Sequence, residues 1–332
     1  MRNPTTAIWS AVAVLAAGGL SWLLLDWLGA FAFWNAIEIG LVYGFVGLGV
    51  FLSFRVLNFP DLTVDGSFPL GAMVVAALLI GGDPFWGNPW IATLVAFVAG
   101  CLAGLVTAAL NVVFKILHLL ASILTMYALY SINLRVGDGR PNLSVRNLDS
   151  VVDVMDGVGL PSNYVEPTLL LVLLVIAIGL LTWFLTTDFG LGMRATGINP
   201  KMARAQGIPT GRNIYAGMAL SNGLVAVGGG LFAQTAGFAD ATSGTGTIVF
   251  GLAAVIIGET LLPFRGIWIL LAGCVFGSVI YRLARQSALE WDGICVGNSC
   301  FEVLASDLNI ITAAIVVLAL VLPQLRSWSR SR

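Results

Sequence analysis

Two carboxylates interrupt an apolar stretch of the chain. Residues 58–71 read NFPDLTVDGSFPLG, which places Asp61 and Asp65 four residues apart, among two prolines and two glycines. Pro69 has no backbone donor and crowds the carbonyl of Asp65, so the pattern predicts unwound backbone over 58–71. Carboxylates in such a segment can bind a solute amine, or accept hydrogen bonds that hold a neighbouring helix. The chemistry predicted here is recognition and not bond cleavage.

The two aspartates are expected to differ in role. Asp61 follows a proline and is predicted to cap the next helix. For Asp65 two interpretations stay open: contact with a solute amine, or structural bonding of the break to a neighbouring helix, which is favoured. The residues predicted to line a path for the solute are Asn58, Asp61, Thr63, Asp65, Ser67, Ser122, Thr125 and Asn222.

A second group of residues is expected to dock on a partner protein. Residues 188–212 contain Asn199 before Pro200, a pair typical of a helix start, and Gly207 two residues before a proline, which is typical of a helix end. The pattern predicts a helix from Pro200 to Gln206, which is too short to be stable without a partner to pack on. The residues predicted to form this docking helix and its flanks are Arg194, Asn199, Pro200, Lys201, Arg204 and Gly207.

The composition indicates that membrane-spanning helices position these residues. Of the 332 residues, 58% are apolar and 10% charged, whereas soluble domains carry about 25% charged residues. The chain is therefore predicted to be an all-α polytopic membrane protein. With two lysines and one histidine, we expect no metal site. Runs of about 20 apolar residues predict ten spans, at 7–25, 36–54, 62–81, 90–114, 118–135, 167–187, 213–235, 245–262, 264–284 and 307–325.

Positive charge predicts the orientation. If the N-terminus is cytoplasmic, eleven basic residues fall in cytoplasmic segments and five in outer ones, so both termini are expected inside. The cytoplasmic group is Arg2, Arg55, Lys115, Arg194, Lys201, Arg204, Arg212, Arg265, Arg326, Arg330 and Arg332. The outer group is Arg135, Arg140, Arg146, Arg282 and Arg285.

The chain is expected to be one permease-like domain over 1–332 with an inverted repeat. Residues 1–35 form an extra span, 36–135 a first repeat, 136–212 an outer loop, a linking span and the docking loop, and 213–325 a second repeat. Each repeat contains a break, at 58–69 and in the Gly/Thr-rich turn at 237–247. Opposed halves with matched broken helices are typical of transporters. The outer loop is interpreted either as a connector or as a docking surface.

Cys295 and Cys300 share a short loop assigned to the outer side, where an oxidising compartment predicts a disulfide between them.

Several longer strings resemble a known family. GMRATGINPKMARAQGI is similar to the coupling loop of ABC importer permeases of the branched-chain amino acid and ribose type. SFRVLNFPDLTVDGSFPLGAM, LSNGLVAVGGGLFAQTAGFAD and GTIVFGLAAVIIGE resemble the subgroup described as aromatic amino acid (tryptophan/tyrosine) permeases. The resemblance covers about residues 36–325.

The resemblance implies a multi-pass permease of the bacterial inner membrane that is not itself an enzyme. It implies a homodimer of permease chains, two ATPase subunits that bind ATP and magnesium, and an extracytoplasmic binding protein that delivers an amino acid. No phosphate-binding G-x-x-x-x-G-K-[S/T] motif occurs in the chain, in agreement with ATP binding elsewhere. No cofactor in the chain and no nucleic-acid partner are expected. The alternative function is an ion-coupled secondary transporter that uses intramembrane carboxylates.

Overall fold

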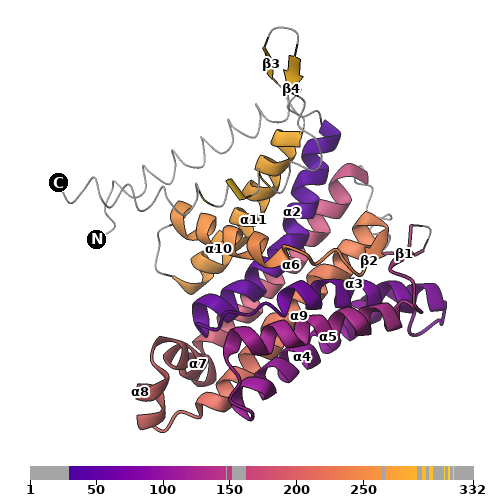
Figure 1. The fold of residues 1–332 in the computed structure, drawn as a ribbon. Helices are drawn as coiled ribbons and strands as arrows, with labels where there is room; N and C mark the ends of the chain where they lie inside the picture. The colour runs from indigo at the N-terminus through magenta and orange to yellow at the C-terminus, as the bar shows by residue number, and fades with distance from the viewer. Residues whose placement is uncertain are drawn as a thin grey trace.

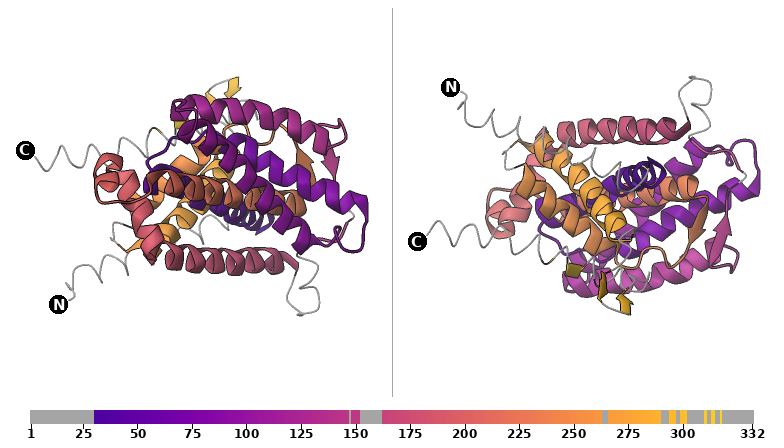
Figure 2. Two further views of the ribbon diagram at one scale, coloured as in Figure 1. Left: turned by 90° about the horizontal axis from the view of Figure 1, so that it is seen from below. Right: turned by 90° about the horizontal axis from the view of Figure 1, so that it is seen from above.

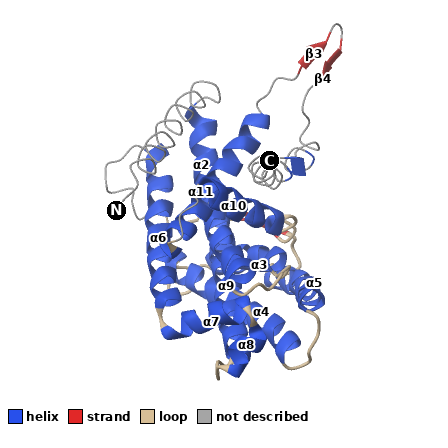
Figure 3. Cartoon of the chain, turned by 90° about the vertical axis from the view of Figure 1, so that its left-hand side faces the viewer, coloured by secondary structure: helices blue, strands red, loops and turns tan. Residues whose placement is uncertain are grey.

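The computed structural model of the chain describes residues 30–146, 148–151, 162–262, 266–289, 294–296, 299–301, 310, 313–314 and 317. Almost all of this part is helical (Figures 1 and 3). In chain order the elements are α2 (Ala30–Val50), η1 (Phe51–Val56), α3 (Val64–Gly81), α4 (Pro89–Val112), α5 (His118–Val136), β1 (Asn142–Ser144), α6 (Ser162–Thr186), α7 (Asp188–Ile198), α8 (Pro200–Ala205), α9 (Thr210–Ala236), β2 (Phe238–Asp240), α10 (Thr247–Leu261), α11 (Ile267–Leu289), β3 (Ile294–Val296) and β4 (Ser299–Phe301).

Seven helical stretches in the described part are long and apolar enough to cross a membrane. They are Phe31–Val56, Val64–Gly81, Pro89–Val112, His118–Val136, Val165–Thr186, Thr210–Ala236 and Ile267–Ser287. An eighth predicted span corresponds to α10, whose 15 residues cover only about 22 Å and do not cross the hydrocarbon core alone. The predicted span at 7–25 lies outside the described residues, and the one at 307–325 lies almost wholly outside them. The all-α polytopic class is confirmed.

Helix α11 extends beyond the predicted end of its span at 284 and contains Arg282 and Arg285, which were assigned to the outer group of basic residues. Both residues lie inside α11, which continues to Leu289. The apolar run in the sequence ends near 284, but hydrogen-bonded helix extends beyond it because the neighbouring helix α2 covers this part of α11.

The helices pack around α9, which contacts α2, α3 and α4. Helix α6 lies along one side of the bundle beside α2 and α11, whereas α4 and α5 lie on the opposite side (Figure 2). Helices α7 and α8 lie together at one end, called the α8 end below (Figure 3). The main core includes apolar residues of α2, η1, α3 and α9 and of the segment 57–63, among them the buried Phe59, Phe68 and Met218.

Glycines allow α9 to approach its neighbours at backbone distance. A Cβ at Gly71 of α3 would overlap the carbonyl of Ala226, and a Cβ at Gly104 of α4 would overlap the carbonyl of Met218. Small residues of this kind let membrane helices gain close van der Waals contact. Part of the glycine excess of the sequence therefore serves the packing of α9.

The first break lies earlier in the chain than predicted. Helix α2 ends in the π-helical turn η1, residues 57–63 are non-helical, and α3 begins at Val64 with Pro69 inside it. Asn58 lies in the left-handed region at φ 53°. Pro69 removes one helical bond, and Gly244 packs closely against the carbonyl of Asp65 that it leaves free.

Two further features were not predicted. Residues 188–198, read as a loop, form helix α7, which Thr187 caps by accepting a bond from the amide of Gly190 (3.3 Å). Strand β1 of the outer loop pairs antiparallel with β2, with Asn142 opposite Asp240. The pair joins the outer loop to the second predicted break. Residues 147 and 152–161 of the loop that was interpreted as a connector or a docking surface lie outside the described residues.

The close contact between α4 and α9 can be tested by placing a larger side chain in it. We expect Gly104→Leu to destabilise the protein by about 1–3 kcal/mol or more, since its side chain meets backbone and not a movable side chain. The measurement is the melting temperature in detergent.

Gly179→Leu on α6 is the matched control, because Gly179 is exposed and a Cβ there meets nothing within 4 Å. Equal melting temperatures for the two variants would contradict the backbone contact between α4 and α9.

Candidate functional site

A buried hydrogen-bond network forms where the first break meets α9. The Nδ2 of Asn222 donates to Oδ2 of Asp61 at 2.7 Å, and the Oγ of Ser67 donates to Oδ1 of Asn222 at 2.7 Å. The amide of Thr63 donates to the other Asp61 oxygen at 2.9 Å. Both Asp61 and Asn222 have no exposed surface. One asparagine on α9 thus joins the non-helical segment to the start of α3.

The network extends to α4. The hydroxyl of Thr63 lies 2.8 Å from that of Thr107, which also bonds the carbonyl of Ala103. The sequence analysis did not single out Thr107; its only signal is a hydroxyl inside an apolar run.

Asp61 is held by geometry more than by charge. It accepts the amide of Thr63, and it also binds Asn222, which was not predicted. The N-cap position of α3 is occupied by Thr63, so Asp61 binds the amide that precedes the helix and does not itself occupy the predicted cap position. Removing one partner from a buried polar group costs about 1–3 kcal/mol, so the break depends on this bond.

Asp65 points to a different helix. Its Oδ1 accepts the amide of Ile248 at 2.7 Å and its Oδ2 accepts the amide of Gly246 at 3.3 Å. Gly246 is the N-cap residue of α10 and Ile248 lies in its first turn, where backbone donors lack helical partners and the helix dipole favours negative charge. Asp65 therefore caps α10 from α3, which corresponds to the structural interpretation of this residue.

The two predicted breaks meet at Asp65. Its carboxylate binds the start of α10, and Gly244 in the preceding turn packs against its carbonyl so closely that a Cβ would overlap it. Non-helical backbone within a membrane is stable only where protein or a water-filled path surrounds it. The short helix α10 and the late start of α3 fit the broken helices of transporters.

The remaining predicted path residues do not join this network. Asn58 is exposed in the break. Ser122 and Thr125 are buried on α5 and bond only the carbonyls of Leu119 and Ala121 in their own helix. The bond from α5 to the start of α3 comes instead from Asn133, whose Nδ2 donates to the carbonyl of Gly66 at 3.3 Å.

The predicted docking helix forms as α8. The Oδ1 of Asn199 accepts the amides of Lys201 and Met202, both at 3.1 Å, and Gly207 follows the helix at φ 79°. The helix ends at Ala205, one residue earlier than predicted. Lys201 and Arg204 are exposed, whereas Arg194 on α7 is half-buried.

The α7–α8 unit is fixed to the bundle at two places. The Nδ2 of Asn213 on α9 donates to Thr196 of α7 at 3.0 Å, and the Nε of Arg204 donates to Thr210 at 2.9 Å. On the other side, Gly197 packs against the carbonyl of Val56, at the end of η1, with no room for a Cβ. The unit therefore touches the residue that precedes the first break.

An ion pair also lies at the end of η1. Nε of Arg55 in η1 lies 2.6 Å from Oε1 of Glu259 near the end of α10. The bond ties the helix before the first break to the helix after the second.

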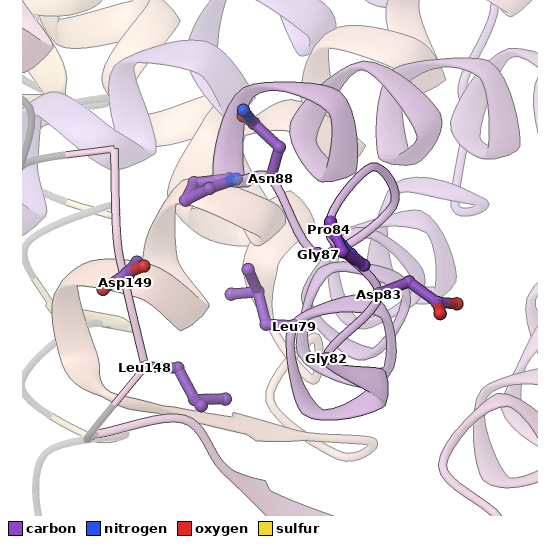
Figure 4. Close-up of a pocket in the computed structure, with 9 residues that line it drawn as sticks. Leu79, Gly82, Asp83, Pro84, Gly87, Asn88, Leu148 and Asp149 are labelled. Atoms are coloured by element: carbon purple, nitrogen blue, oxygen red, sulfur yellow. The ribbon is translucent and has the colours of Figure 1, made fainter.

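A cavity of about 340 Å³ opens beside the α3–α4 loop (Figure 4). Asp83 lies on that loop, Asn88 begins α4, and Leu148 and Asp149 come from the segment after β1. Within the described residues, no group of three or more His, Cys, Asp or Glu side chains is placed to hold a metal ion.

The two outer cysteines lie on a hairpin. Strands β3 and β4 pair antiparallel, with Cys295 directly opposite Cys300. The disulfide stays a prediction.

The fold and the joined breaks define a polytopic helical membrane protein of transporter type. The chain belongs to the family of permease components of branched-chain amino acid transport systems, whose model matches residues 33–322. The tyrosine transport system permease protein of Clostridioides difficile is 36% identical over 83% of this chain and 86% of its own length. More distant relatives are the guanosine ABC transporter permease protein NupQ of Bacillus subtilis, 27% identical over 60% of this chain and 66% of the relative, and the fructose import permease protein FruF of Bifidobacterium longum, 26% identical over 69% and 62%. The chain is thus an ABC transporter permease and not an enzyme.

The role of Asp65 as a cap can be tested by comparing two substitutions. Asp65→Ala removes both acceptors and should lower the free energy of unfolding by about 1–2 kcal/mol, whereas Asp65→Asn keeps one acceptor and should lose less. Uptake should persist in Asp65→Asn. Loss of uptake in a stably folded Asp65→Asn protein would contradict the capping role and assign the charge to solute recognition.

Two asparagine–proline helix starts allow a controlled test of α8. Asn199→Ala and Asn88→Ala each remove a cap that accepts backbone amides, at opposite ends of the protein, and each should cost about 1 kcal/mol. Only Asn199→Ala should reduce ATP hydrolysis by the assembled transporter, measured per folded complex. Equal reductions would contradict a special role for α8.

Proposed function

We propose that the chain is the transmembrane subunit of an ATP-driven importer that moves an amino acid, aromatic in its side chain, across the bacterial inner membrane. An extracytoplasmic binding protein delivers the solute. The family and the relative described as a tyrosine transport system permease support the solute class.

The observation that carries the proposal is the α7–α8 unit. It presents Ile198 and Met202, which are 85% and 62% exposed, next to the cations Lys201 and Arg204. An apolar centre with basic neighbours at the end of a membrane bundle suits the groove of a soluble ATPase. The cap at Asn199 gives this short helix a fixed shape before it docks.

The contacts of this unit give a route for mechanical force. A displacement of α7 moves Gly197 against Val56 at the end of η1, and the non-helical segment follows directly. Asp61 then pulls on α9 through Asn222, while Asp65 pulls on α10. Helices joined in this way can move together, so that the protein switches between an inward-open and an outward-open form.

The assembly and orientation belong to the same proposal. Two copies of the chain form the pore with two ATPase subunits, which hold ATP and magnesium, and both termini of each chain lie inside. The α8 end faces the cytoplasm. The binding protein docks at the opposite end, where the cavity beside the α3–α4 loop opens.

The path itself runs along the joined breaks. The residues proposed for it include Asn58, Asp65, Ser122 and Thr125, with the Asp61–Asn222 network as its fixed wall. Exposed hydroxyls of Thr242 and Thr245, in the turn before α10, add a polar surface at membrane depth.

The alternative is a secondary transporter driven by an ion gradient through Asp65 or Glu259. Both carboxylates already have partners, the amides of α10 for Asp65 and Arg55 for Glu259. That pairing favours the ATP-driven function.

Reconstitution decides between the two. In proteoliposomes with the ATPase and the binding protein, we expect tyrosine or tryptophan uptake that needs ATP, and no uptake when the ATPase is omitted. Gradient-driven uptake by the permease alone would overturn the proposal and establish the alternative.

A further inference from the structure

Two half-buried arginines lie inside α11, and neither forms an ion pair with a carboxylate in the part of the chain that the structure describes. Arg282 and Arg285 are three residues apart and share one face of the helix. The Nε atoms of both are buried without a hydrogen-bond partner. The ion pair between Arg55 and Glu259 is the one found among the described residues, so neither arginine has a carboxylate partner there.

The pair lies in the half of the bundle away from the α8 end. Helix α11 runs antiparallel to α2: Ser278 bonds the carbonyl of Gly40 at 2.8 Å, and the Cβ of Arg282 also lies next to Gly40. Gly40 is sixteen residues before Val56, where α2 and η1 reach α7. Charged residues at such depth are costly and mark functional sites.

The arginines border a cluster of aromatic rings. Tyr43 of α2 lies close enough to both guanidinium groups to interact with their charges. Its ring centroid is 4.4 Å from that of Phe250 on α10, which is 4.5 Å from that of Tyr281 on α11. Tyr43 also stacks on Phe68 of α3 at 5.2 Å. Four helices thus meet at these rings.

This cluster adjoins the joined breaks. Phe68 lies three residues after Asp65, and Phe250 lies two residues after Ile248, whose amide Asp65 binds. Any movement of α10 against α3 therefore also changes the spacing of the rings.

Two positive charges side by side repel each other, and an anion between them removes that repulsion. Guanidinium groups bind a carboxylate through two parallel hydrogen bonds. Aromatic walls next to the charges accept a ring by offset or edge-to-face packing. An aromatic amino acid carries both groups on one small molecule.

We propose that Arg282 and Arg285 bind the carboxylate of the transported amino acid while the aromatic cluster of Tyr43, Phe68, Phe250 and Tyr281 packs against its ring. The proposal rests on the proposed function and adds the residues that recognise the solute. In the present conformation the rings contact one another, so the solute enters when α10 and α11 move away from α2.

The test is uptake of radiolabelled tyrosine into proteoliposomes that contain the permease, its ATPase and the binding protein. We expect Arg282→Gln and Arg285→Gln each to lower the initial rate at least tenfold, while ATP hydrolysis stimulated by the binding protein stays within twofold of wild type. Arg282→Lys keeps the charge and should retain more uptake than Arg282→Gln. The matched control is Arg135→Gln, since Arg135 is exposed in the last turn of α5, and its uptake should be unchanged.

Three outcomes overturn the inference or its basis. Uptake within twofold of wild type in both glutamine variants excludes a carboxylate contact. A parallel fall of uptake and stimulated ATP hydrolysis in every Arg282 and Arg285 variant, Arg282→Lys included, makes the arginines part of the conformational cycle and overturns solute recognition. If the wild-type assembly takes up neither tyrosine nor tryptophan, the proposed solute class fails first, and the arginine variants are not the cause.

Discussion

The carboxylate of Asp65 at the start of α10 is the interaction on which the rest of the structure depends. A helix of 15 residues has unpaired amides at its first turn, which need acceptors from outside the helix. Asp65 on α3 accepts one of those amides, from Ile248, and the amide of the N-cap residue Gly246. Without it, the second break would have to refold or move, and the contact of Gly244 with the start of α3 would be lost with it.

The same contact connects the two halves of the chain. The first break is held to α9 by Asn222 and to α7 by the packing of Gly197 on Val56, and the second is held to the first by Asp65. Arg55 and Glu259 repeat the connection near the α8 end. Each of these bonds joins residues of different helices, so the bundle transmits displacement of α7 and α8 as a concerted change and not as local bending.

Local sequence patterns were sufficient to predict some features of the structure. Apolar runs located eight described helices, and the asparagine–proline pair located the start of α8, because a cap is satisfied within three residues. Prolines and glycines indicated the first break, but α3 begins at Val64 and includes Pro69, and its contact with Gly244 joins segments that no local pattern connects. The Asp61–Asn222 bond joins residues 161 apart, and the β1–β2 pair is equally remote in sequence. The end of α11 was predicted too early, at 284, because charge at the end of an apolar run resembles a loop.

Hydrogen exchange of the assembled transporter, with and without ATP bound to the ATPase, tests the central claim most directly. The claim is that α7 and α8 act on the joined breaks through Val56, Asp61 and Asp65. It predicts that ATP changes exchange both in residues 188–209 and at the amides of 246–250, and that Asp65→Ala removes the second change while the first persists. Changes confined to 188–209 in the wild-type assembly would contradict it.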